Sequence, residues 1–180
     1  MPRPVIAILL GGLVAGVLDI LYAIVVFGPL SYGVPAMRIL QSVNAGWIGR
    51  EASRAGEWTT AMQGLATHFL LATIMAAVFV LAARAIPALL KRPVLWGIVY
   101  GLILYVAMNY VVVPLSAAAT GHFASSLGEV TSRLQDSFSA IRPEPDPDYP
   151  WMLAGTIFTH TIFVGVPIAL IAKRFGPQQD

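Results

Sequence analysis

The chain of 180 residues has no cysteine, and charged residues make up only 11% of it. The lack of cysteine excludes disulfides and thiolate metal sites. An ordinary soluble domain carries about 25% charged residues, so this chain is too poor in charge for that class. Its lysines and arginines lie in short clusters beside apolar segments. They form no basic stripe with interleaved aromatic residues, so a nucleic-acid partner is not expected.

Common enzyme motifs are also missing from the sequence. It has no Gly-x-Ser-x-Gly, no His-Glu-x-x-His and no phosphate-binding glycine loop. An enzyme would have to be built from the few polar side chains inside the apolar segments. We therefore do not expect an enzyme.

Four long apolar segments dominate the chain: Val5–Phe27, Thr59–Ala83, Pro93–Ala119 and Trp151–Ala172. Each is long enough to cross a hydrocarbon layer of about 30 Å as a helix. The first is too long for the apolar part of a signal peptide, and we interpret it as a retained helix. The sequence thus predicts an all-α polytopic membrane protein, with residues 1–180 forming a single integral membrane domain in the lipid bilayer.

The basic residues predict how the chain is oriented. Those at the span ends on one side are Arg3, Arg84, Lys91, Arg92, Lys173 and Arg174, opposed there only by Asp180. On the other side, five arginines are offset by seven acidic residues. Because cytoplasmic segments carry the excess of lysine and arginine, we predict a bacterial inner-membrane protein with both termini in the cytoplasm and two long outward loops.

The two halves of the chain resemble each other. Aligning the first and third spans without a gap places Gly12 and Gly16 opposite Gly97 and Gly101. Aligning the second and fourth spans places Thr67-His68 opposite Thr159-His160. This pattern predicts two parallel helix-pair repeats, over about residues 5–83 and 93–172. The four glycines form two Gly-x-x-x-Gly pairs, which are typical of close helix packing in membranes.

Both outward loops carry amphipathic segments. In the first loop, apolar residues recur at helical spacing from Ile39 to Trp47, and in the second from Phe123 to Ile141. We expect two interfacial helices that lie against the outer ends of the spans. Residues 142–150 then form a proline-rich acidic connector, in which alternating prolines prevent a helix.

One polar side chain lies in each span at nearly the same depth, roughly 12–15 Å below the outer surface. These residues are Asp19, His68, Asn109 and His160, with Thr67, Thr159 and Tyr22 as supporting hydrogen-bond donors. Ionisable groups inside a membrane are costly and are often functional. We expect this layer to be the site of an ion or a proton.

Three uses of the layer remain open. Transport or channel-like handling of protons, or of a proton-coupled ion, is the leading hypothesis, because histidine titrates near neutrality. Asp19 would bind the cation or proton, His68 and His160 would relay it, and Asn109 would orient the network. The alternative is a non-transporting subunit or scaffold whose polar network is structural. The third is electron transfer by haem b ligated by both histidines, although no cofactor and no metal is predicted.

Several short motifs carry a resemblance to a known group. They are Thr67-His68-Phe69, Arg84-x-x-Pro87, Trp96-Gly97 through Pro114-Leu115-Ser116, and the Phe158-x-His160 helix that ends in Lys173-Arg174. With these motifs, most of the chain resembles the YagU-like group of bacterial inner-membrane proteins.

The resemblance implies a link to acid tolerance, with His68 and His160 matching the membrane histidines of the YagU-like group. Asp19 and the segment 39–47 have no counterpart in that group. Independently of the resemblance, four spans are few for a complete permeation path. We therefore expect a homo-oligomer, with a further membrane partner also possible.

Overall fold

The computed structural model describes residues 2–140 and 146–176, which form helices joined by turns and short loops. The chain divides into two compact units. The first unit comprises residues 1–22, 68–105 and 154–180, and the second comprises residues 23–67 and 106–153. Each unit draws residues from both predicted repeats, so the unit boundaries and the repeat boundaries fall at different places.

The four helices expected to span a membrane are present. They are α1 (Arg3–Phe27), α4 (Glu57–Ala85), α6 (Pro93–Ala107) continued by η1 and α7 to Leu115, and α10 (Met152–Phe158) continued by η2 and α11 (Val166–Phe175). Each is long and apolar enough to cross a bilayer. The third span ends at Leu115, four residues before the predicted end at Ala119. It ends there because Ser116 has an extended backbone. The Ser116 hydroxyl caps the next helix by accepting a hydrogen bond from the Ala118 N–H.

Shorter helices fill the connections: α2 (Ala36–Ile48), α3 (Arg50–Ala55), α5 (Ala88–Lys91), α8 (Ala117–Thr120) and α9 (Leu127–Ser139). The amphipathic segment between the first two spans, Ile39–Trp47, lies within the helix α2. In the second loop, α9 begins after Phe123, because the Ser126 hydroxyl caps it by accepting from the Glu129 N–H. Ile141 and the connector residues 142–145 lie outside the described residues.

Two spans contain a π-helical turn, η1 (Met108–Val112) and η2 (Thr159–Gly165). In each case a proline follows within two residues, Pro114 in α7 (Val113–Leu115) and Pro167 in α11. Proline has no N–H for the carbonyl one turn earlier and its ring clashes there, so the preceding turn widens. The Tyr110 carbonyl, four residues before Pro114, accepts instead from the Ser137 hydroxyl at 3.1 Å.

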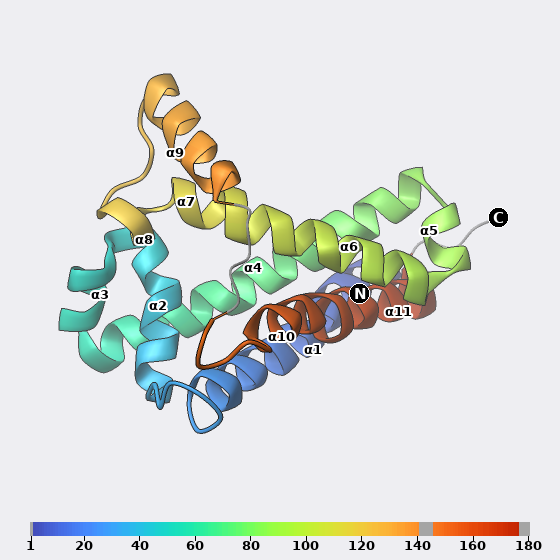
Figure 1. The fold of residues 1–180 in the computed structure, drawn as a ribbon. Helices are drawn as coiled ribbons and strands as arrows, with labels where there is room; N and C mark the ends of the chain where they lie inside the picture. Colours follow the sequence, from blue (N-terminus) through green and yellow to red (C-terminus); the bar gives the residue numbers. More distant parts are fainter. Residues whose placement is uncertain (1, 141–145, 177–180) are drawn as a thin grey trace. The chain divides into compact units, whose positions relative to one another are not determined.

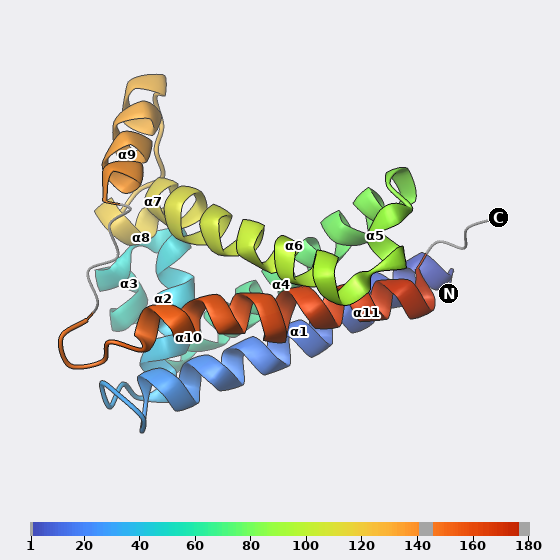
Figure 2. The same ribbon diagram turned by 45° about the vertical axis from the view of Figure 1, so that its right-hand side comes forward.

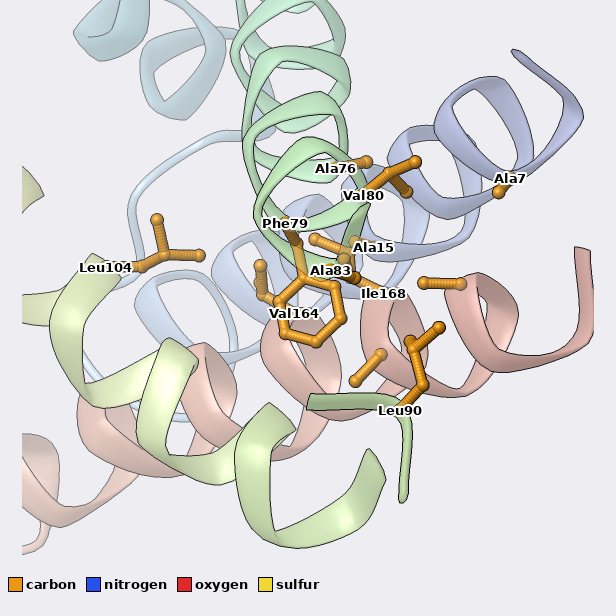
Figure 3. Packing of buried hydrophobic residues seen from close by; sticks show 12 residues of the cluster. Ala7, Ala15, Ala76, Phe79, Val80, Ala83, Leu90, Leu104, Val164 and Ile168 are labelled. Carbon is orange, nitrogen blue, oxygen red and sulfur yellow. The ribbon is translucent and has the colours of Figure 1, made fainter. Parts of the chain in front are cut away.

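Small side chains let the helices of the first unit approach closely. A Cβ on Gly12 would lie 2.6 Å from the Thr73 Cα, and one on Gly97 would lie 2.7 Å from the Val166 Cα. Around these crossings the core is built mostly of alanine and valine with a few larger side chains, as Figure 3 shows for Ala15, Phe79 and Ile168.

The first-unit part of α1 runs beside α11 in both ribbon views (Figures 1 and 2). The Arg3 guanidinium donates a hydrogen bond to the Arg174 carbonyl there.

Polar side chains hold the second unit together. Gln41 of α2 is almost fully buried, and its amide donates to the Glu57 carbonyl at 2.8 Å and to the Thr60 hydroxyl at 3.2 Å. Arg133 of α9 donates to the carbonyls of Pro114 and Ser116. These bonds fix α2 against the start of α4, and α9 against α7 and α8.

Candidate functional site

Asp19 lies on α1, on the same side as Gly16 and Gly12, where α1 contacts α4 and η2. Its side chain is 30% exposed. The Oδ1 oxygen accepts a hydrogen bond from the Thr159 hydroxyl at 3.1 Å, and Thr159 itself is buried. The carboxylate is thus oriented by a side chain from the fourth span.

His68 lies on α4 and reaches across to α1. Its Nε2 is 2.9 Å from the Gly16 carbonyl oxygen. A carbonyl can only accept, so Nε2 carries the hydrogen. The other ring nitrogen, Nδ1, faces Asp19 with 4.0 Å between Nδ1 and Oδ2, and the His68 side chain is only 13% exposed. Gly16 makes this approach possible, because a Cβ there would lie 2.8 Å from the Phe69 ring beside His68.

The geometry places a carboxylate and an imidazole nitrogen opposite each other. With Nε2 of His68 bonded to the Gly16 carbonyl, Nδ1 is the ring nitrogen that faces Asp19.

His160 has different surroundings from His68. It lies in η2, and its Nδ1 bonds to the Thr156 carbonyl of its own helix at 2.8 Å. Its ring packs edge-on against Tyr105 of α6, with 5.7 Å between ring centroids. His160 therefore carries its hydrogen on Nδ1, whereas His68 carries it on Nε2. The two histidines share a repeat position in the sequence but not a hydrogen-bonding role.

The remaining predicted residues are spread over both units. Tyr22 packs its ring edge-on against Phe163, and its hydroxyl oxygen is buried without a hydrogen-bond partner. Thr67 lies in the second unit, where its hydroxyl accepts from the Trp47 indole N–H at 3.1 Å. Asn109 also belongs to the second unit, on η1, and its side chain is exposed. The structure thus brings together Asp19, His68 and Thr159.

One functional group was missed by reasoning from the sequence, namely the Gly16 carbonyl. The sequence identified Gly16 as a packing residue. Its carbonyl is also the acceptor that fixes the His68 ring. A glycine about one turn before Asp19 on the packed face was the available signal, since the lack of a side chain lets a neighbouring helix approach the backbone closely.

Charged groups outside the spans form their own cluster on α9. Hydrogen bonds from the Ser125 backbone N–H, from Arg133 and from His122 lower the pKa of Glu129 to about 2. Elsewhere outside the spans, the hydrogen bond from Tyr32 to Asp146 raises the pKa of the Tyr32 phenol to about 12. The same bond lowers the pKa of the Asp146 carboxyl. Both clusters tie loop segments together.

Over the described ranges, no group of three histidine, aspartate or glutamate side chains is placed to hold a metal ion. Comparison with protein-family models, with curated proteins and with solved structures finds no match. The chemistry of the site is therefore argued from its own residues, of which Asp19 and His68 are the titratable pair.

Proposed function

We propose that this protein binds and moves protons across a membrane, as a small transporter or channel-like protein, through Asp19 and His68. The observation that carries the proposal is the facing of Asp19 Oδ2 and His68 Nδ1 at 4.0 Å, with His68 Nε2 already committed to Gly16. A carboxyl group and an imidazole that face each other form a site that can take up and release a proton.

The proton step needs no other reactant. A proton arriving on the Asp19 carboxylate gives a neutral acid, and its transfer to His68 Nδ1 gives an imidazolium beside a carboxylate. A direct hydrogen bond requires about 2.7–3.2 Å, so transfer uses a small rotation of Asp19 or one bridging water. Thr159 holds the other carboxylate oxygen throughout.

Purified protein in liposomes tests the proposal. A pH-sensitive dye inside the vesicles reports acidification when a potassium diffusion potential is applied. We expect flux above protein-free vesicles for the natural protein, and background flux for Asp19→Asn and His68→Gln. These variants remove the titrating group but keep an acceptor for Thr159 and a donor for Gly16. His122→Gln, in an outward loop, is the matched control and should retain flux.

His160→Gln belongs in the same series, because we propose that His160 continues the relay within η2. Loss of flux in this variant would show that the proton path includes His160 in the fourth span. Full flux would show that the path needs only Asp19 and His68. Full flux in Asp19→Asn would contradict the proposal as a whole.

A non-transporting membrane subunit or scaffold is the second candidate. The bonds from Thr159 to Asp19 and from His68 to Gly16 link three spans, and a purely structural network would look the same. Each such bond in a membrane contributes about 0.6–2 kcal/mol. If Asp19→Ala and His68→Ala reduce the yield of folded protein while the surviving protein shows unchanged flux, the scaffold is the better description.

We further propose that the two halves are parallel repeats, and the glycine contacts support this. A Cβ on Gly16 would meet the Phe69 ring, and a Cβ on Gly101 would meet the His160 carbonyl oxygen and the Thr161 Cα. The alignment of Thr67-His68 with Thr159-His160 places Phe69 opposite Thr161. The contacts of the two helix pairs thus lie within one residue of each other in the alignment, which supports the proposal. The position that matches Asp19 holds Leu104, a buried core residue, so the acid is present in one half only.

In the same proposal the protein lies in the bacterial inner membrane, with its termini in the cytoplasm and α2 and α9 at the outer interface. The distribution of lysine and arginine around the spans supports this orientation. The resemblance to the YagU-like group, with its link to acid tolerance, agrees with proton handling.

A further inference from the structure

The first unit carries a group of cations at one of its ends, which we call the basic cluster. Its members are Arg3, Arg84, Lys91, Arg92, Lys173 and Arg174, and all of them are exposed. The start of α1, the short helix α5 and the end of α11 lie at this same end in both ribbon views (Figures 1 and 2). The fold thus gathers cations from segments that are far apart in the chain.

Two contacts hold these segments together. Leu90 of α5 is buried in the same core cluster as Ala172 of α11, and the two helices are in contact; Figure 3 shows Leu90 at the edge of this core. An exposed lysine directly follows each of these two buried residues. The Arg3 guanidinium donates to the Arg174 carbonyl at 3.2 Å, which ties the start of α1 to the end of α11. Cations of α1, α5 and α11 are therefore held near one another.

Acidic side chains do not balance the basic cluster. The first unit contains only two of them, Asp19 and Asp180. Asp19 lies roughly 24 Å from Arg3 along α1, at about 1.5 Å per residue, and Asp180 lies outside the described residues. Within the described ranges, none of the six cations forms an ion pair with a carboxylate.

The ends of the helices do not cancel this charge either. Helices α4, α5 and α11 end here, and α1 and α6 begin here. Each helix end carries about half a unit charge, negative at the C-terminus and positive at the N-terminus. The five ends together therefore leave only about half a negative charge against six positive side chains. Like charges gathered in this way repel one another, and a bound anion relieves the repulsion.

Exposed apolar side chains border the basic cluster. They are Val5 of α1, Leu81 of α4, and Val94 and Leu95 of α6, which are 39–57% exposed. A ligand that fits both surfaces has a negatively charged head joined to apolar chains. A guanidinium or an ammonium group binds phosphate oxygens with charge-assisted hydrogen bonds.

We propose that the basic cluster binds the phosphate headgroup of an anionic phospholipid, whose acyl chains lie along the start of α6. In the orientation proposed above, the cluster faces the cytoplasmic leaflet, and anionic lipids of that leaflet attract cations at the ends of spans. This inference does not depend on proton transport.

Competition between two lipids tests the proposal. The protein, purified in detergent, is mixed with equal amounts of phosphatidylglycerol and phosphatidylcholine, and native mass spectrometry counts the lipid that each molecule retains. Both lipids have a phosphate, but only phosphatidylglycerol has a net negative charge. We expect a preference for phosphatidylglycerol of roughly tenfold or more. Equal retention of the two lipids would overturn the proposal.

Paired substitutions test where the lipid binds. The double variant Lys91→Gln and Arg92→Gln should reduce the preference roughly 5- to 30-fold, because each cation near an anionic lipid contributes about a factor of five. The matched control, Arg50→Gln with Arg54→Gln, removes two exposed arginines of α3 in the second unit and should keep the preference. All four positions are exposed, so both variants should fold. An equal loss in both would mean that only total charge matters and would refute the site.

Inorganic phosphate alone distinguishes a lipid site from a site for a free anion. In detergent, phosphatidylglycerol should raise the temperature of thermal unfolding of the natural protein, and millimolar inorganic phosphate at constant ionic strength should leave it unchanged. An equal rise with inorganic phosphate would assign the basic cluster to a free anion and overturn the lipid proposal.

A fluorescent label on a single cysteine locates the acyl chains, because the natural chain has no cysteine. Val94→Cys lies beside the basic cluster, and Leu102→Cys lies about two turns further along α6; both residues are exposed. In liposomes with a small fraction of brominated lipid, brominated phosphatidylglycerol should quench the label at position 94 several-fold more than brominated phosphatidylcholine does. The two lipids should quench the label at position 102 to the same extent. The same quenching by both lipids at position 94 would contradict the proposal.

Discussion

Single polar residues inside the spans differ in how fully their hydrogen bonds are satisfied. The Asp19 carboxylate has a donor in Thr159, and the His68 ring has an acceptor in Gly16. The Tyr22 hydroxyl oxygen, one turn from Asp19, is buried without a partner. Removing a group that has a partner and removing one that has none should therefore affect stability in opposite ways.

For the first prediction, Thr159→Val removes the donor to Asp19 and should lower the free energy of unfolding by about 0.6–2 kcal/mol. Tyr22→Phe removes a hydroxyl that has no partner, while the ring contact with Phe163 is kept. This variant should be as stable as the natural protein or more stable. Thermal unfolding in detergent measures both. A larger loss in Tyr22→Phe than in Thr159→Val would contradict the hydrogen bonding described here.

The second prediction concerns pH and Glu129, outside the spans. Its pKa is lowered from 4.5 to about 2 in the folded protein. The stabilisation of α9 by the ionised carboxylate is therefore complete above about pH 4.5 and is lost as the pH falls toward 2. Hydrogen exchange of α9 amides, corrected for intrinsic rates, should show weaker protection over this range. Glu129→Gln should already show weakened protection at neutral pH and little further change on acidification.

At the scale of elements, helix crossings depend on glycines whose position matters more than their number. Gly12 packs against the backbone of Thr73, whereas Gly128 of α9 has open space where a side chain would be. The same substitution should therefore have opposite effects at these two helical positions.

The third prediction follows from that contrast. Gly12→Ala forces α1 and α4 apart and should destabilise the protein by roughly 1–3 kcal/mol. Gly128→Ala only raises helix propensity and should be neutral or stabilising by up to about 1 kcal/mol. Thermal or denaturant unfolding of the two variants, made in the same background, gives the comparison. Similar losses in both would mean that α1 and α4 do not cross at Gly12.

At the scale of the whole molecule, the fourth prediction concerns orientation. A membrane-impermeant maleimide applied to intact spheroplasts should label Ser125→Cys, in the segment between α8 and α9. It should not label Ala88→Cys, in the basic loop between α4 and α6. Both should be labelled after permeabilisation, which is the control for accessibility. Labelling of Ala88→Cys alone in intact cells would reverse the predicted orientation.

The amino-acid sequence is enough to identify the four candidate membrane helices, because twenty or more predominantly apolar residues in a row are visible without any tertiary contact. It also identified Asp19, His68 and Thr159, since polar groups inside apolar spans are conspicuous in composition alone. The amphipathic segment of α2 followed from helical periodicity in the same way.

The fold, in contrast, sets how these residues are joined. It placed His68 against the Gly16 carbonyl and Thr159 against Asp19, across three spans that are far apart in the chain. It gave His160 a carbonyl of its own helix, and it left Asn109 exposed on η1. Hydropathy and periodicity specify which residues enter a membrane and on which face of a helix they lie. The partner of each polar atom depends instead on where helix backbones approach most closely, and glycine contacts between distant segments set that distance.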